Sequence, residues 1–265
     1  MRDLLLIDKI DFYIVLPVII LSGWLLGMVV NYLADVLPRE RRFVRPSCFY
    51  CNETLGWINY LFLPRQCKKC GRHRRPRAIL VEVFFILICI YLWMYPPERL
   101  GFPVSILLLV YFILVTIIDI EHRLIMHSIS FLGALLCLVT GIWLHGVRVT
   151  FLGGVIGFGI MLGVYLLGLG FTQLLMRWHK HAIIEEEALG FGDVTLSGVI
   201  GLLLGWPGVL AAIILGIIIA GLVSVLYVLV KAIRHEYRVG LSLPYGPFLV
   251  AATFGLLVLK EISLK

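Results

Sequence analysis

The sequence predicts an all-α polytopic membrane protein with about eight transmembrane helices and a small cytoplasmic insert that resembles a zinc ribbon. Hydrophobic residues make up 61% of the 265 residues and charged residues only 15%, whereas soluble domains are roughly half apolar and a quarter charged. The apolar residues gather into long runs, and four cysteines share one strongly basic segment. These features exclude a globular domain that is tethered by a single anchor.

Eight apolar segments qualify as membrane spans, because a span needs roughly 20 mainly apolar residues. The sixth and seventh are separated only by GWPG at 205–208 and are easily misread as one helix. In the fifth, the pairs Gly153/Gly157 and Gly159/Gly163 form small-residue patterns that favour close helix packing. The eight segments are residues 12–37, 78–95, 102–119, 124–145, 149–176, 192–206, 208–231 and 244–260.

The placement of Lys and Arg predicts how these spans are oriented. Eleven of the 23 Lys and Arg residues lie in the segment 38–77, and cytoplasmic loops are enriched in these residues. Alternating the spans from there places 120–123, 177–191 and 232–243 in the cytoplasm and both termini outside. The formal net charge of +7 therefore reflects topology and attraction to the anionic lipid bilayer, and no nucleic-acid partner is expected.

The basic segment contains Cys48-x2-Cys51 and, fifteen residues later, Cys67-x2-Cys70. This is the spacing of a four-cysteine zinc ribbon, in which two short knuckles place four thiolates around a tetrahedral ion. Four thiolates leave no open position for water, so the zinc is expected to be structural, and a segment too small for its own core depends on the metal to fold. The alternative of two disulfides is disfavoured by the reducing cytoplasm.

Two aspartates lie at span ends that the predicted topology places at the cytoplasmic border. Asp119 ends the third span and Asp193 opens the sixth. An ionisable residue within a span marks a functional site by default, because burying its charge is costly. Two carboxylates that approach closely hold one proton between them, so that the charged member can activate a water and the protonated member can donate to a carbonyl. The pair is therefore a candidate aspartic dyad.

Gly190 and Gly192 precede Asp193 in the stretch LGFGDVTLSG. Glycine adopts backbone angles that are closed to other residues, and without side chains these two would let an extended substrate backbone approach Asp193. Helix capping is an equally good interpretation of Asp193, since an aspartate stabilises the start of a helix. Capping does not explain Asp119, which lies at the C-terminal end of its span, where the helix dipole disfavours an anion.

Five stretches follow one another as LGMVVNYLADVLP (26–38), RAILVEVF (77–84), IDIEHRLIM (118–126), GFGDVTL (190–196) and PYGPFLVAA (244–252). With the paired CxxC knuckles between the first two, they resemble the motifs of bacterial type IV prepilin peptidases, which are membrane aspartic proteases of the GxGD class. The joint occurrence of the motifs, in order along the whole chain, makes the resemblance specific.

The chain departs from the usual pattern of this family at a few positions. Met126 and Thr195 stand where proline and lysine are usual, Ala78 and Ile79 stand where Tyr and Pro are usual, and the arginine expected near Val36 is absent. Both aspartates and all four cysteines are kept. The departures at 36, 78 and 79 fall in the part of the chain that the resemblance ties to methylation.

The resemblance implies an enzyme of the bacterial inner membrane that cleaves the basic leader from prepilins or pseudopilins at the cytoplasmic face. It also implies N-methylation of the new N-terminus with S-adenosylmethionine. On this basis residues 1–100, which include the insert 38–77, form the methyltransferase part, and residues 101–265 form a six-span peptidase part. The candidate methyltransferase residues are Asn31, Arg77 and Glu82, although Glu82 is also explained by snorkelling or by pairing with Arg77.

Three rival functions remain at this point. The first is a prepilin peptidase without methyltransferase activity, which the cysteine insert and Glu82 argue against. The second is a non-catalytic zinc-bearing scaffold of a pilus or secretion complex, which gives no purpose to Asp119 and Asp193. The third is a small-solute transporter, which would need polar residues near the middle of the membrane, and these are scarce.

Overall fold

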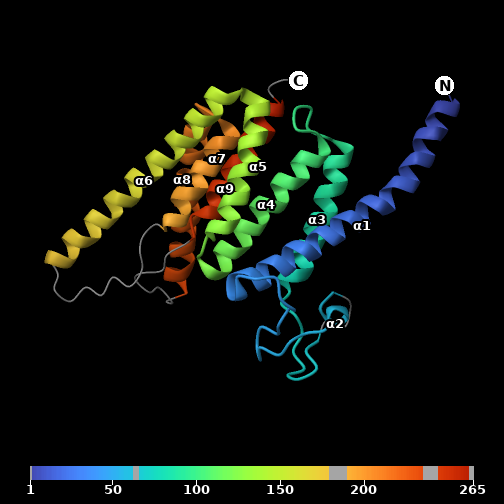
Figure 1. The fold of residues 1–265 in the computed structure, drawn as a ribbon, viewed down its shortest axis with the longest axis horizontal. Coiled ribbons are helices and arrows are strands. Elements are labelled where there is room, and N and C mark those ends of the chain that lie inside the picture. The colour runs from blue at the N-terminus through green and yellow to red at the C-terminus, as the bar shows by residue number, and fades with distance from the viewer. Residues whose placement is uncertain (1, 62–65, 179–189, 235–243, 263–265) are drawn as a thin grey trace. The chain divides into compact units, whose positions relative to one another are not determined.

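The structure is a computed structural model that describes residues 2–61, 66–178, 190–234 and 244–262. The described part consists of α-helices, with a long insert between α1 and α3 (Figure 1), so the predicted all-α class is confirmed. The helices are α1 (Arg2–Glu40), α2 (Trp57–Leu61), α3 (Arg77–Met94), α4 (Gly101–His122), α5 (His127–His145), α6 (Val147–Trp178), α7 (Phe191–Leu204), α8 (Gly208–Ile233) and α9 (Gly246–Ile262).

Each of the eight apolar segments coincides with a helix, and α2 is an additional helix in the insert. Six helices are long and apolar enough to cross a membrane, namely α1 over Val15–Glu40, α3, α4, α5, α6 over Val147–Phe171, and α8. The helices α7 and α9 are shorter, at 14 and 17 residues. A helix of 14 residues rises about 21 Å, less than the hydrocarbon core of roughly 30 Å. The number of eight spans therefore stays a prediction.

The chain forms two compact units, Met1–Leu114 and Val115–Lys265. Their boundary falls inside α4, about four turns after the division expected at residue 100. The last turns of α4, including Asp119, therefore belong to the same unit as α5–α9. Which activity resides in which part of the chain stays a prediction.

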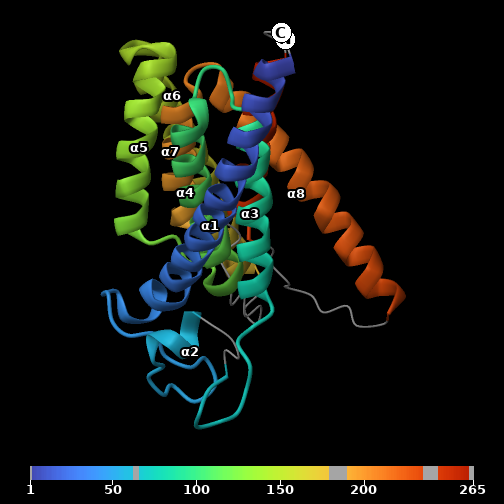
Figure 2. The same ribbon diagram turned by 90° about the vertical axis from the view of Figure 1, so that its right-hand side faces the viewer.

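In the first unit, α1 and α3 pack side by side (Figure 2). Two glycines of α1, one turn apart, make this contact close. A Cβ atom added at Gly23 would lie 2.8 Å from the Cα of Ile86, and one added at Gly27 would lie 2.7 Å from the Cα of Glu82. Only glycine allows the backbones to approach this closely, as small-residue patterns do between membrane helices.

The insert between α1 and α3 is built from two similar knuckles, residues 47–54 and 66–73. In each knuckle the first and last residues form a single antiparallel bridge. The residue after the second cysteine has a positive φ in both, 55° at Asn52 and 68° at Gly71, a conformation that asparagine and glycine adopt most readily. The sequence thus repeats one turn structure nineteen positions apart, and each copy presents two cysteines.

In the second unit, α7 is the central helix and packs against α5, α6, α8 and α9 (Figure 1). Ten of its 14 residues are buried, which is typical of a helix that is apolar all round. The contact with α6 depends on small residues, since a Cβ atom at Gly157 would lie 2.6 Å from the carbonyl oxygen of Ser197. The predicted packing role is confirmed for Gly153 and Gly157, but a Cβ atom added at Gly159 or Gly163 would meet no described residue within 4 Å, so the role is not seen there.

Candidate active site and the polar clusters

Asp193 is the third residue of α7, and its side chain is buried at the start of that helix. Its Oδ2 atom accepts a hydrogen bond from the Gly190 N–H at 3.2 Å, which satisfies one of the N–H groups that a helix leaves without a partner. Its Oδ1 atom is buried and has no hydrogen-bond partner among the described residues. The capping contact is therefore real, and it uses only one of the two carboxylate oxygens.

Asp119 lies in the last turn of α4 and is 6% exposed. Its Oδ2 atom is buried and forms no hydrogen bond of good geometry within the described part of the chain, and the nearest backbone donor is the N–H of Gly246. The C-terminal end of a helix disfavours an anion, and Arg123, one turn further on, is an attractive charge within range. Burial at this end of the helix therefore costs stability, and the attraction of Arg123 opposes that cost.

The two carboxylates belong to one unit and lie within electrostatic range of each other. They come from α4 and α7, far apart in the sequence, and each keeps one buried oxygen without a hydrogen bond. Burying a carboxylate oxygen without a donor is costly, so two such carboxylates within electrostatic range of each other are unusual in a structural role. This arrangement suits a pair that shares one proton and acts on a bound water.

The structure gives the two glycines before Asp193 a different role from the one expected. Neither Gly190 nor Gly192 has a positive φ, so the expectation that they adopt glycine-only backbone angles is wrong. A Cβ atom at Gly192 would lie 2.7 Å from the Cβ of Ile125, and glycine is needed there because α7 begins against the segment that follows Asp119. At Gly190 the nearest atom is the Asp193 Oδ2, at 3.8 Å.

Gly246 is a site residue that the sequence reasoning did not assign. It begins α9, and a Cβ atom there would lie 2.5 Å from Oδ2 of Asp119 and 3.5 Å from a methyl group of Leu196 on α7. The backbone of α9 therefore closes directly over the Asp119 carboxylate. The signal was present in the PYGPF stretch, but nothing local in that stretch says which carboxylate it meets.

The four cysteines of the insert come together as predicted. Their sulfur atoms all lie within 4.8 Å of one another, with Cys48 and Cys70 separated by 3.7 Å and Cys51 and Cys67 by 3.5 Å. Tetrahedral zinc with Zn–S bonds of about 2.3 Å separates its sulfur ligands by about 3.8 Å, which fits these distances. Backbone N–H groups of Cys70 and Lys69 lower the pKa of the Cys67 thiol, whereas burial and the neighbouring thiols raise the pKa of Cys51, as expected for one proton shared within a cluster of thiols.

Next to the knuckles lies a polar cluster centred on Asp35, which the sequence reasoning also missed. Its Oδ2 atom accepts hydrogen bonds from the Tyr60 hydroxyl at 2.7 Å and from Arg74 at 2.9 Å, and its Oδ1 accepts one from Arg77 at 2.5 Å. Burial and the negative charge of Asp35 raise the pKa of Tyr60 above its usual range, so its hydroxyl stays a donor. Arg77, a methyltransferase candidate, is thus part of a network that joins α1, the insert and α3.

The other two methyltransferase candidates are buried in the contact between α1 and α3. The side-chain amide of Asn31 donates to the carbonyl oxygen of Ala78 at 2.9 Å, and its Oδ1 atom has no hydrogen-bond partner among the described residues. Glu82 is 5% exposed and accepts a hydrogen bond from the indole of Trp24 at 3.2 Å. Both are polar groups in an apolar helix contact, which is an unusual place for them.

Comparison with known proteins gives these clusters a context. A family described as "Type IV leader peptidase family" matches residues 106–225, and one described as "Bacterial Peptidase A24 N-terminal domain" matches residues 21–95. The first match contains both aspartates, and the second contains all four cysteines. The chain belongs to the type IV leader peptidase family. This membership and the six apolar helices indicate a multi-pass protein of the bacterial inner membrane that takes part in prepilin processing.

Three curated relatives illustrate the similarity. The "Prepilin leader peptidase/N-methyltransferase" of Aeromonas hydrophila is 24% identical over 82% of this chain and 72% of its own length, and that of Myxococcus xanthus is 25% identical over 78% and 61%. The "Type 4 prepilin-like proteins leader peptide-processing enzyme" of Escherichia coli is 25% identical over 77% of this chain and 72% of its own length. No solved structure matches the chain.

Proposed function

We propose that the chain cleaves the basic leader from type IV prepilins or pseudopilins at the cytoplasmic face of the membrane, with Asp119 and Asp193 as its catalytic pair. The observation that carries this proposal is the pair itself, two buried carboxylates from different helices of one unit, each with an oxygen that no described donor satisfies. A buried acid without a donor persists where its chemistry is used. The scaffold and transporter alternatives explain neither oxygen.

The mechanism follows from one proton shared by two acids. The ionised member takes a proton from a water held between the pair, and the resulting hydroxide attacks the carbonyl carbon of the peptide bond after the leader. The protonated member donates to the carbonyl oxygen as its charge develops. The tetrahedral species then collapses, the C–N bond breaks, and the acid–base pair delivers a proton to the leaving amine. The hydrogen bond from Gly190 fixes the orientation of Asp193 throughout.

We further propose that the first unit N-methylates the new N-terminus with S-adenosylmethionine, and that Glu82 and Asn31 act in this step. The supporting observation is that both side chains place polar oxygens inside the contact between α1 and α3. A buried carboxylate such as Glu82 attracts either the incoming amine or the sulfonium of the methyl donor. The donor supplies the methyl group, and Asn31 and Glu82 align the amine with it, since orientation provides much of the rate in such transfers.

The insert is proposed to hold one structural zinc ion through Cys48, Cys51, Cys67 and Cys70. We expect about one zinc per purified chain, and none when Cys48 and Cys51 are both replaced by Ser, because the two remaining thiolates cannot complete a tetrahedral site. Elemental analysis measures the metal, and limited proteolysis of the insert reports its folding. A Cys89→Ser/Cys137→Ser variant, which changes two cysteines outside the cluster, is the matched control. Wild-type protein without zinc contradicts this proposal.

The activity is tested with purified protein in detergent and a synthetic peptide that contains a basic leader, a glycine and an apolar helix that begins with phenylalanine. Mass spectrometry identifies both products, with the cut expected after the glycine. Adding S-adenosylmethionine should increase the mass of the C-terminal product by one methyl group. Cleavage without methylation would support a peptidase-only enzyme, and the absence of both would overturn the proposed function.

A further inference from the structure

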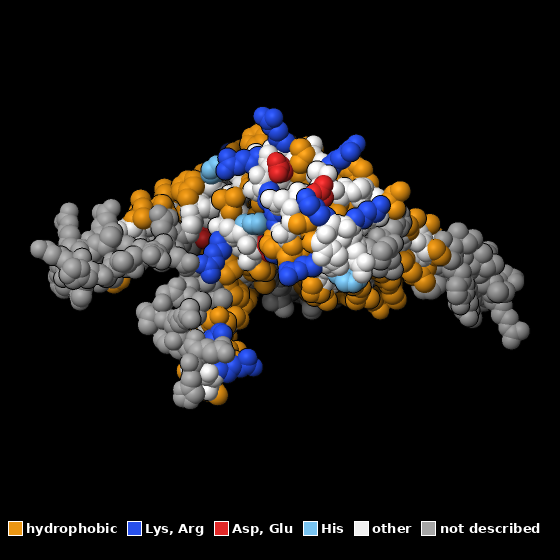
Figure 3. All heavy atoms as spheres, turned by 90° about the horizontal axis from the view of Figure 1, so that it is seen from below, with side chains coloured by type: hydrophobic (Ala, Val, Ile, Leu, Met, Phe, Trp, Pro, Cys, Tyr) orange, Lys and Arg blue, Asp and Glu red, His pale blue; other side chains and the backbone are white. Residues whose placement is uncertain are grey.

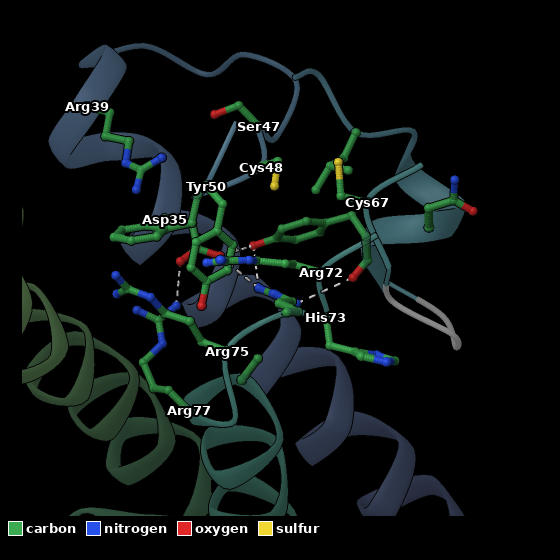
Figure 4. A pocket seen from close by; sticks show the side chains of 16 residues that line it. Asp35, Arg39, Ser47, Cys48, Tyr50, Cys67, Arg72, His73, Arg75 and Arg77 are labelled. Atoms are coloured by element: carbon green, nitrogen blue, oxygen red, sulfur yellow. Dashed lines mark hydrogen bonds and ion pairs between the residues drawn. The ribbon is translucent and has the colours of Figure 1, made fainter. Parts of the chain in front are cut away.

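A pocket in the first unit uses neither Asp119 nor Asp193. It lies between the end of α1 and the start of α3, is covered by the insert, and has a cavity volume of about 50 Å³ that opens to solvent (Figure 4). Its charged lining is strongly unbalanced, since five arginines face one carboxylate. These residues are Arg39, Arg72, Arg74, Arg75, Arg77 and Asp35.

The one carboxylate of the lining is already occupied. Asp35 accepts hydrogen bonds from Tyr60, Arg74 and Arg77, so it balances little of the charge on the other arginines. A zinc ion with four thiolates would add a net charge of about −2 beside the pocket, and the lining would still be positive. The pocket is therefore complementary to an anion.

Four of the lining arginines lie over aromatic rings of the insert, among them Arg39 and Arg72. The guanidinium carbon of Arg39 lies 4.5 Å from the ring centre of Phe49, and that of Arg72 lies 4.6 Å from the ring centre of Tyr50. Neither guanidinium forms an ion pair within the described part of the chain. A guanidinium over an aromatic ring keeps its N–H groups for other partners, and their fork matches the oxygens of a phosphate.

The charge of the pocket distinguishes between possible ligands. S-adenosylmethionine carries a sulfonium and an ammonium against one carboxylate, so it is a net cation and would meet arginines without a free acid to pair with. A phosphate group is an anion, so the arginines attract it, and the fork of each guanidinium can bind two of its oxygens. The pocket is thus unsuited to the methyl donor and suited to a phosphate.

The position of the pocket identifies the source of that phosphate. Asp35 and Arg39 lie at the end of the span Val15–Glu40, and Arg77 begins the span Arg77–Met94, so the pocket lies where both helices leave the hydrocarbon. On the insert, Trp57 stacks on Tyr32 of α1 with ring centres 5.2 Å apart. Trp57 and its neighbour Ile58 expose 44% and 76% of their surface, which is typical of residues that lie at the membrane interface.

We propose that this pocket binds the phosphate of an anionic phospholipid headgroup, and that the lipid anchors the insert against the membrane. Basic pockets at the cytoplasmic ends of membrane helices bind such headgroups. The insert itself is strongly basic, with eleven Lys and Arg residues in 38–77, and Figure 3 shows many such side chains at the surface, so the insert also attracts an anionic bilayer. The pocket adds a site where one headgroup is bound by forked hydrogen bonds.

The test is titration of the full chain, in an uncharged detergent, with fluorescent phosphatidylglycerol. In Arg39→Ala/Arg72→Ala we expect binding to weaken by tenfold or more, since each arginine near an anionic lipid contributes about 1 kcal/mol. The control Arg42→Ala/Lys68→Ala removes the same charge from the same insert, outside the pocket, and should change binding by less than twofold. Phosphatidylcholine should bind weakly to every variant.

Two further experiments test whether the bound phosphate belongs to a lipid or to a soluble compound, and whether it binds in this pocket. Soluble glycerol phosphate should compete only at far higher concentration than the lipid, and competition at equal concentration would move the source to a soluble compound. An equal loss of lipid binding in the pocket and control variants, or no loss in either, would show that the lipid does not bind in this pocket. Thermal unfolding and zinc content verify that the variants are folded.

If the alanine pair does not fold, Arg39→Lys/Arg72→Lys keeps the charge but removes the fork, and should weaken binding about threefold or more against the same control.

Discussion

The two units of this protein treat a carboxylate near a helix end in opposite ways. In the first, Asp35 accepts hydrogen bonds from a tyrosine and two arginines. In the second, Asp119 and Asp193 each bury an oxygen that forms no hydrogen bond of good geometry with a described residue. All three aspartates lie near the ends of apolar helices, so their sequence surroundings look alike.

The difference teaches how to separate a structural acid from a chemical one. An acid whose oxygens are all paired contributes to stability, and removing it leaves its donors unsatisfied. An acid with an unpaired buried oxygen costs stability, and proteins retain such costs mainly at functional sites. The comparison therefore predicts opposite consequences for the same chemical change at the two places.

The largest effect is expected for cleavage in Asp119→Asn and Asp193→Asn. Either change should lower the rate by about 1,000-fold or more, because an amide cannot exchange the proton that general acid–base catalysis moves. The rate of prepilin peptide cleavage by purified, folded enzyme measures this. Glu121→Gln removes a carboxylate two residues from Asp119 and should stay within about threefold of the wild type. Near-normal cleavage by either asparagine variant would exclude the pair as the catalytic site.

A smaller effect, confined to the other unit, is expected from Glu82→Gln. Methylation should fall by about 100-fold, because the carboxylate no longer attracts and orients a cationic group, while cleavage should change less than about threefold. The size of the side chain and its contact with Trp24 are preserved. Conversely, Asp193→Ala should still methylate a synthetic peptide that already has the mature N-terminus. Loss of both activities in folded Glu82→Gln would contradict separate sites.

The placement of Asp119 by α9 is tested with two glycines of that helix. A methyl group at Gly246 would press on the Asp119 carboxylate, whereas one at Gly255 would meet no described residue within 4 Å. Gly246→Ala should therefore slow cleavage by about tenfold, since small displacements of catalytic groups are costly, and Gly255→Ala should leave it unchanged. Equal rates in the two variants would show that α9 does not position the carboxylate.

The smallest effects, but of opposite sign, are expected in thermal stability. Asp35→Asn should lower the free energy of unfolding by about 2 kcal/mol, because it breaks charge-assisted hydrogen bonds from Arg74 and Arg77. Asp119→Asn should raise it by about 1 kcal/mol, because it replaces an unpaired buried acid with a neutral group of the same shape. Thermal unfolding in one detergent compares the two directly. Destabilisation of similar size at both positions would remove the distinction between the units.

Much of this architecture could be read from the sequence because it rests on local patterns. Long apolar runs predicted the eight helices, and the spacing of Cys48, Cys51, Cys67 and Cys70 predicted a cluster that the structure assembles with sulfurs within 4.8 Å. The positions of Asp119 and Asp193 at helix ends were also evident. The length of an apolar run and the spacing of cysteines are properties of short stretches of sequence, so they can be recognised without knowledge of the fold.

Other features were decided only by tertiary structure. That Asp35 is fully paired, that Gly246 covers Asp119, and that Gly192 is a packing residue against Ile125 all depend on contacts between helices distant in the sequence. The central position of α7 and the boundary inside α4 have the same origin. A hydrogen-bond partner or a steric neighbour is fixed by how helices pack, and helix packing depends on side-chain shape across the whole unit, which no single stretch of sequence contains.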